Sequence, residues 1–245
     1  MRLPLVLILF AALVATAADS ISKYEQPFFR TATIYARGSN RKTVLFKLSR
    51  TVSRNGNSVK AAREFTSPDG KVAAREWLTY DGDKLVSYEL DDPQTGSKGS
   101  AKVVRDGDKA KLVFEFTTGN KTKTGSETFR SDTVVNDMIY PCLASHWKEL
   151  MSGEAVKCHY IALSRAETVG FDFVKTGETT VNGKPVVIVK MSPSNFIISA
   201  LVDPLIFMIE KNGEHRVLDY DGATTPHIKV GDKFKDLDAI TVFDW

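Results

Sequence analysis

The residues able to do acid–base, nucleophilic or metal chemistry are scattered along the chain and form no recognised motif. The sequence lacks a Gly-x-Ser-x-Gly elbow, a glycine-rich phosphate loop and a His-Glu-x-x-His pair. His146 and Glu149 are one helical turn apart, but a zinc site needs more ligands than two. We therefore predict no catalytic residue, no metal site and no cofactor. The histidines are His146, His159, His215 and His227.

Paired carboxylates and one charged pair favour structural roles. Neighbouring acidic residues in turns usually bind the turn backbone, and no Asp-x-Asp-x-Asp-Gly calcium loop occurs. Arg165 and Glu167 lie two residues apart, which predicts an ion pair at the rim of a sheet. The acidic pairs are Asp91 with Asp92 and Asp236 with Asp238.

The first 18 residues have the layout of a secretory signal peptide. Arg2 precedes an apolar run over residues 3–14, and Ala15, Thr16, Ala17 and Ala18 follow. The run is shorter than the ~20 residues that a spanning helix needs, although an uncleaved anchor is the alternative. We predict cleavage after Ala17 or Ala18 and a periplasmic or secreted mature chain.

Export would decide whether the two cysteines, Cys142 and Cys158, can form a disulfide. Disulfides persist outside the cytoplasm, and closing a loop of about 15 residues is worth roughly 3 kcal/mol in the chain-entropy model. We therefore predict a disulfide between them. Two separate buried thiols are the alternative.

Charge and hydropathy narrow the range of partners. The formal net charge is only +3 and both signs are mixed along the chain, whereas nucleic-acid binding needs a clustered basic surface. The longest apolar stretch after the signal, residues 196–208, is interrupted by Asp203 and Pro204, so no membrane span is expected in the mature chain. Residues 19–245 are predicted to form one domain.

Turn pairs and period-two alternation dominate this domain. Asn-Gly and Asp-Gly pairs recur between short runs such as Leu112, Phe114 and Phe116, which share one face of a strand. The pattern predicts one long up-and-down antiparallel sheet. The expected strands are 28–36, 43–52, 58–66, 72–80, 84–91, 100–105, 110–118, 124–130, 155–164, 167–175, 184–191, 205–211, 214–220 and 239–244.

Two helices are expected to interrupt the strands. The first covers 141–152, begins at Pro141 and places Leu143, Trp147, Leu150 and Met151 on one stripe. The second covers 194–202 and is apolar on all sides. Two short helices cannot cover the apolar face of so large a sheet unless it curves strongly around them. The expected architecture is therefore mainly β, a half-open barrel enclosing two short helices.

Such an architecture leaves space between sheet and helices for an acyl chain or another apolar ligand. The helix 194–202 would act as a lid over that space. A fully packed core without a cavity is the alternative. The residues predicted to line a hydrophobic site are Trp147, Leu150, Phe171, Phe196, Ile197, Ile198 and Leu201.

Several segments resemble a family of uncharacterised bacterial envelope proteins. They are Trp77 with the hairpin after it, Asp137-Met-Ile-Tyr-Pro141, Thr168-Val-Gly-Phe171, Val202-Asp-Pro204 and Asp244-Trp245. That family resembles in architecture the lipoprotein-localisation carriers, whose half-barrels hold acyl chains under helical lids. The resemblance implies the fold more than the cargo.

Three functional hypotheses follow. The first is an exported, non-enzymatic periplasmic protein that binds a lipid or another hydrophobic molecule. The second is an envelope interaction or scaffold protein with a filled core, whose protein partner contacts the sheet edge or the convex face. The third is a hydrolase acting on an envelope component.

Overall fold

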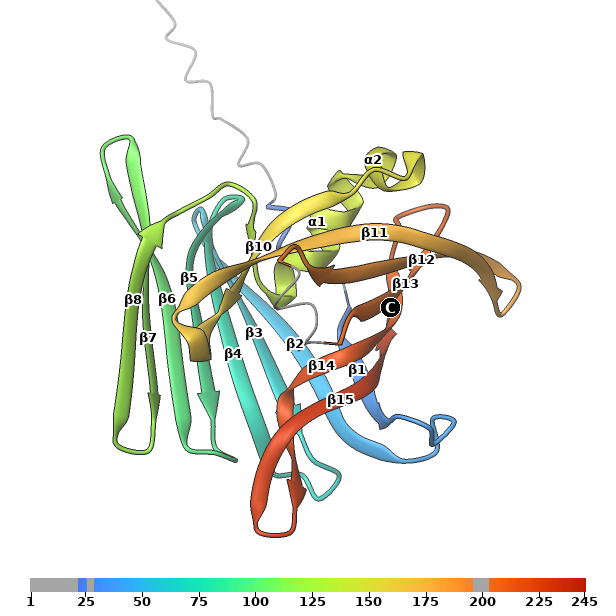
Figure 1. Ribbon diagram of the computed structural model, residues 1–245, viewed down its shortest axis with the longest axis horizontal. Coiled ribbons are helices and arrows are strands. Elements are labelled where there is room, and N and C mark those ends of the chain that lie inside the picture. The colour runs from blue at the N-terminus through green and yellow to red at the C-terminus, as the bar shows by residue number, and fades with distance from the viewer. Residues whose placement is uncertain (1–21, 26–28, 196–202) are drawn as a thin grey trace, which may run out of the picture.

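The computed structural model describes residues 22–25, 29–195 and 203–245. These residues form one fifteen-stranded sheet and two short α-helices (Figure 1). The predicted fold class, a large curved open sheet with two short helices, is confirmed. The elements are β1 Thr31–Ala36, β2 Val44–Asn55, β3 Ser58–Thr66, β4 Val72–Asp81, β5 Lys84–Asp92, β6 Ser97–Asp106, β7 Lys109–Thr118, β8 Lys121–Thr128, β9 Thr133–Val134, η1 Asn136–Met138, α1 Ile139–Ser145, α2 Trp147–Ser152, β10 Val156–Ala162, η2 Leu163–Arg165, β11 Glu167–Val181, β12 Lys184–Pro193, β13 Leu205–Glu210, β14 Val217–Val230 and β15 Lys233–Asp244.

The sheet consists of two meanders joined along one seam. Strands β1–β8 pair in chain order and form what we call the N-terminal half-sheet, while β10–β15 form the C-terminal half-sheet. The seam is the antiparallel pairing of β1 with β15, from Thr31 opposite Asp244 to Ala36 opposite Ala239. The short β9 runs parallel to β10 and lies outside the predicted strands, so the mostly antiparallel sheet is mixed at this edge.

Local turn chemistry explains the meander. Strands β11 and β12 are joined by two residues, Asn182 with φ 51° and Gly183 with φ 78°. This pair of positive φ values matches the two-residue turn whose twist fits neighbouring antiparallel strands. The predicted Asn-Gly hairpin at this position is therefore confirmed.

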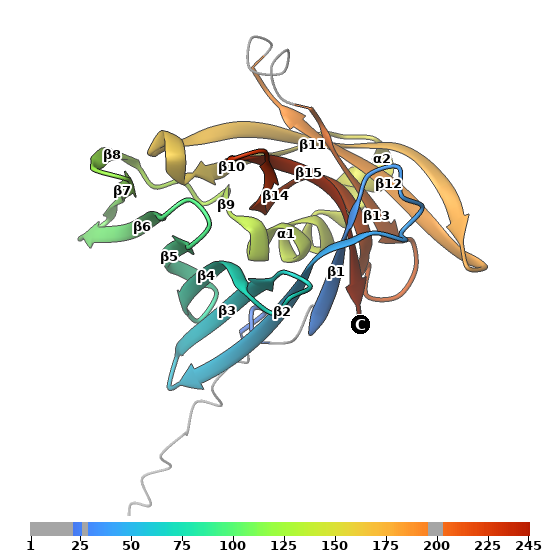
Figure 2. The same ribbon diagram turned by 90° about the horizontal axis from the view of Figure 1, so that it is seen from below.

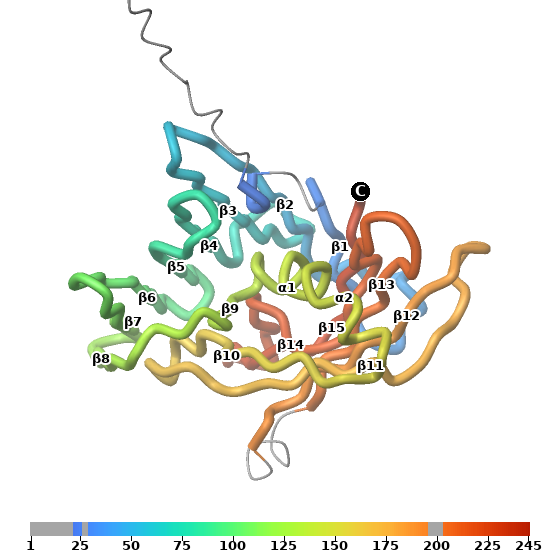
Figure 3. The backbone as a smooth tube through the Cα atoms, turned by 90° about the horizontal axis from the view of Figure 1, so that it is seen from above, coloured from blue at the N-terminus to red at the C-terminus, as the bar shows by residue number. Residues whose placement is uncertain are grey.

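The two half-sheets curl around α1 and face each other across it (Figures 2 and 3). Their facing surfaces form one core, in which Leu78, Phe114, Leu143 and Phe173 are buried. A turn also connects the halves. The Gln94 Nε2 donates to the His227 carbonyl over 3.0 Å, and the His227 N–H donates to Gln94 Oε1 over 2.8 Å.

The region predicted as one helix over 141–152 overlaps two α-helices, because α1 begins two residues earlier, at Ile139, and α2 follows it. The helical conformation is interrupted at His146, which has φ −109° and ψ 28° and lies between α1 and α2. Pro141 is the third residue of α1 and not the first. The N–H of the third helical residue has no partner within the helix, so proline fits there as well. Gly153 ends α2 in the left-handed conformation at φ 87°, as expected. The predicted lid helix has residues 196–202 outside the described ranges.

Several smaller predictions can be compared with the structure. The Arg165 Nε lies 2.6 Å from Glu167 Oε1, which confirms that ion pair. Asp92 Oδ1 accepts the N–H of Gln94 over 2.9 Å and of Thr95 over 3.2 Å, which confirms a turn-binding carboxylate.

Candidate functional site

The seven residues predicted to line a hydrophobic site do not form one lining. Leu150 and Phe171 are buried in the common core, whereas Trp147 is only half-buried at its rim. The Trp147 ring stacks on His215 with ring centroids 4.0 Å apart. The remaining four predicted residues, Phe196, Ile197, Ile198 and Leu201, lie outside the described residues.

The predicted disulfide is not present. Cys142 lies on α1 and Cys158 on β10, and both thiols are free. Burial raises the pKa of the Cys142 thiol to about 11, and burial also raises the pKa of Cys158. Each cysteine therefore packs as a protonated side chain.

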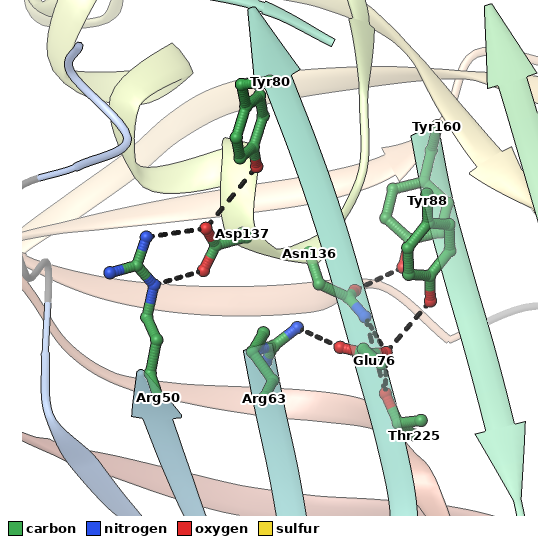
Figure 4. Close-up of polar contacts among 9 residues, drawn as sticks. All are labelled: Arg50, Arg63, Glu76, Tyr80, Tyr88, Asn136, Asp137, Tyr160 and Thr225. Atoms are coloured by element: carbon green, nitrogen blue, oxygen red, sulfur yellow. Dashed lines mark hydrogen bonds and ion pairs between the residues drawn. The ribbon is translucent and has the colours of Figure 1, made fainter. Parts of the chain in front are cut away.

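A set of buried polar and charged side chains lies against the inner face of the sheet and is drawn in Figure 4. Three strand neighbours, Arg50, Arg63 and Glu76, stand in register on β2, β3 and β4 and point into the core. Asn136 and Asp137 on η1 contact these side chains on the inner face of the sheet, Asn136 at Glu76 and Asp137 at Arg50. We call the whole set the buried polar cluster. Its members are Arg50, Arg63, Glu76, Tyr80, Tyr88, Asn136, Asp137, Tyr160 and Thr225.

Arg50 and Asp137 form a two-point ion pair that water does not reach. Arg50 Nε lies 2.7 Å from Asp137 Oδ1 and Nη2 lies 2.9 Å from Oδ2. Both side chains are 0% exposed. The Arg50 Nη2 also donates to the Tyr24 carbonyl over 2.8 Å. The pair fixes η1, and the helices after it, against β2.

Glu76 is the centre of the other part of the cluster. Its Oε2 lies 2.6 Å from Arg63 Nη1, and its Oε1 accepts hydrogen bonds from Tyr88, Asn136 and Thr225. Those donors come from β5, η1 and β14, so one carboxylate joins both half-sheets to the chain between them. The Tyr160 hydroxyl on β10 bonds in turn to Asn136 Oδ1.

Burial determines the charge states of several groups here. Burial raises the pKa of the Tyr88 and Tyr160 hydroxyls, so both stay protonated hydrogen-bond donors. Burial works against the charge of Arg63, but the nearby Glu76 and Asp137 carboxylates leave its pKa raised. The cluster combines fixed charges with neutral donors, which suits bracing of the two halves.

A second candidate lies on the outer surface of the N-terminal half-sheet. A groove with a volume of about 390 Å³ runs over β4–β7 around the half-buried Trp77. We call it the Trp77 groove. Its lining residues are Trp77, Glu89, Leu90, Asp91, Lys98, Gly99, Ser100, Lys102, Glu115 and Thr117.

The strand register shows why these side chains meet. Trp77 is opposite Glu89, Glu89 opposite Ser100, and Ser100 opposite Glu115, so the four form one row across four strands. Trp77 alternates with the buried Glu76 and Leu78, so it points away from the core. Sequence reasoning used Trp77 only for the family resemblance. An aromatic residue on the polar phase of a strand was the available signal.

Another pocket is lined in part by Ser22, the first described residue. Its volume is about 310 Å³, and Ser22 and Asp83 are among the residues that line it. The Ser22 hydroxyl donates to the Gly82 carbonyl over 2.8 Å, and the Lys23 N–H donates to Asp83 Oδ1 over 2.9 Å. These contacts anchor the segment before β1, so we assign the pocket a structural role.

Two surveys of the described residues complete the site description. Within residues 22–25, 29–195 and 203–245, no group of three or more His, Cys, Asp or Glu residues is arranged to hold a metal ion. In the same ranges, no helix has the length and apolar character needed to cross a bilayer.

Comparison with known proteins finds no matching family model, no matching curated protein and no matching solved structure. The resemblance to bacterial envelope proteins therefore stays a prediction.

Proposed function

We propose that the chain is an exported, non-enzymatic binding protein of the cell envelope that recognises its partner with the outer face of the N-terminal half-sheet. The Trp77 groove is the observation that carries this proposal. It combines a large, partly exposed aromatic ring with carboxylates, ammonium groups and two hydroxyls. Binding sites commonly combine an apolar contact surface with a few placed polar groups.

The buried polar cluster favours a filled core over an internal ligand chamber. A ligand entering between the half-sheets would have to displace η1 and separate Arg50 from Asp137. Breaking a buried ion pair leaves an uncompensated charge and typically costs about 3–5 kcal/mol. The contacts of Glu76 with Asn136 and Thr225 would be lost as well.

Binding of a lipid or another hydrophobic molecule is the second candidate. It is favoured by the incomplete burial of Trp147 and Met151 on α2, where they pack against the rim of the core. An apolar ligand would extend that rim toward Phe171. Uptake of a fluorescent fatty acid, lost in Trp147→Ala and kept in Trp77→Ala, is the result this candidate requires.

Titration of ¹⁵N-labelled mature protein with separated envelope fractions tests the main proposal. We expect a fraction that shifts the Trp77 indole signal and amides of β4–β7, and no such shift in Trp77→Ala. Shifts confined to α2 and β11 would support the hydrophobic candidate instead. No shift with the lipid, glycan or protein fraction would contradict the proposal.

Export is tested separately. N-terminal sequencing of protein recovered from outside the cytoplasm should give a start at Ala18 or Asp19. Material that begins at Met1 and stays with the membrane would contradict cleavage.

A further inference from the structure

We infer that the Trp77 groove takes a neutral, polyhydroxylated ligand, namely a saccharide chain. This inference rests on the proposed function and specifies the chemistry of its partner. Three features carry it: the setting of the Trp77 ring, the balance of charge along the groove and the pairing of the strands below it.

The ring of Trp77 has a small side chain on one side only. Its register neighbours are Ala62 on β3 and Glu89 on β5, and Ser100 follows two strands away in the same row. The ring is partly exposed on a face that is mainly polar. An indole presents a flat apolar surface with a negative π face, which suits the C–H face of a sugar ring.

The charged groups are nearly balanced in sign. Glu89 and Glu115 lie in the Trp77 row, while Lys98 and Lys102 line the same groove on β6 and are exposed. Lys98 Nζ lies 3.7 Å from Asp91 Oδ1. A polyanion would meet the carboxylates, and a polycation would meet the lysines. Hydroxyl groups both donate and accept, so they can bond to either kind of charged group.

The strands beneath the groove leave no backbone groups for a peptide. Strands β4, β5, β6 and β7 each pair with a neighbour on both sides. Their backbone N–H and C=O groups are therefore used within the sheet, and a peptide could not add as a further strand. Recognition must use side chains alone, which favours a ligand that carries its own hydrogen-bonding groups.

The size of the groove fits a chain more than a single sugar. Neighbouring strands lie about 4.8 Å apart, so the row from Trp77 to Glu115 spans roughly 14 Å. That length accommodates a short oligosaccharide laid across the strands. Trp77 would bind one ring at one end, and Glu115 and Ser100 would bond hydroxyls of the next.

Calorimetry with two soluble neutral probes, cellotetraose and chitotetraose, tests the inference on the mature protein. We expect at least one to bind, with at least a tenfold loss of affinity in Trp77→Ala and a smaller loss in Trp77→Phe. Glu115→Gln should weaken binding about threefold, because a charge-assisted hydrogen bond becomes a neutral one. Trp147→Ala is the matched control and should bind as the parent does.

Three outcomes would overturn the inference. They are no binding of either tetrasaccharide, equal binding by Trp77→Ala, and loss of binding in Trp147→Ala alone. Should Trp77→Ala fail to fold, Glu89→Ala with Glu115→Ala takes its place and must lose binding. If an envelope protein shifts the Trp77 signals while both saccharides fail, the inference is wrong and the proposed function stands. If no envelope fraction shifts them, both are wrong.

Discussion

The two half-sheets place charge and apolar surface differently. In the N-terminal half-sheet, charged Arg50, Arg63 and Glu76 point inward and the outer face is largely charged or hydroxylic. In the C-terminal half-sheet, the inner face is apolar around Phe173, and the outer face also carries half-buried apolar side chains. These outer residues are Val174, Ile188, Ile206, Met208, Ile240 and Val242.

Alternation along a strand therefore does not by itself say which residues pack the core. A strand with strict alternation can carry a charged residue at single positions of its buried, mostly apolar phase when another segment supplies matching partners, as η1 does. A strand that is apolar on both phases keeps one of them near solvent. Arginines from the β1–β2 loop partly cover that outer face: Arg37 Nε lies 2.6 Å from Asp221 and Arg41 Nη2 lies 2.6 Å from Asp219.

Asp137 is the carboxylate that neutralises the buried charge of Arg50 in the N-terminal half-sheet. Asp137→Ala leaves Arg50 buried and unpaired, and we expect it to lower the free energy of unfolding by about 3–5 kcal/mol. Urea denaturation of the mature protein measures this. The double variant Arg50→Met, Asp137→Leu should recover much of the loss. A single variant as stable as the parent would show that the interior is open to water.

Cys142 tests how dry the space between the half-sheets is. Burial raises its pKa from 9.0 to about 11, so the thiolate is disfavoured in the folded state. Its stabilising contribution is fully present below pH 9 and is lost as the pH rises through 11. Relative to Cys142→Ala, the parent should lose roughly 2 kcal/mol between these values. Parallel pH profiles of the two proteins would indicate a hydrated thiol.

A matched pair of valines compares the two outer faces directly. Val242 on β15 is half-buried, whereas Val113 on β7 is 40% exposed. Replacing a methyl by a hydroxyl should cost about 1 kcal/mol at Val242 and less than about 0.5 kcal/mol at Val113. Thermal unfolding of Val242→Thr and Val113→Thr decides this. Equal costs would mean that the outer faces do not differ.

Much of the N-terminal half-sheet could be predicted from the sequence. The expected strands 84–91 and 110–118 correspond closely to β5 and β7, because tight turns and period-two runs are local signals. The C-terminal half-sheet was harder. The prediction gave strand 214–220 and omitted most of β14, since Pro226 interrupts the pattern. Pro226 lies where the β14–β15 register shifts, which is where a strand tolerates proline.

The candidate sites were missed although local signals existed. Arg50 lies on the same face of its strand as Phe46 and Leu48, and Glu76 lies on the same face as Leu78. Each is therefore a charged residue on an otherwise apolar face. Trp77 is the reverse case, a large aromatic residue on the polar face of its strand. Their partners could not be predicted, because Arg50 and Asp137 are 87 residues apart and no periodicity connects them.

The seam between β1 and β15 has a consequence for how the chain is made. Its partners are separated by more than 200 positions, as Thr31 and Asp244 are. Pairings of such long range raise the contact order and slow folding. The sheet cannot be completed until β15 has emerged from the ribosome. The seam therefore forms only after β15 is available, when this strand pairs with β1.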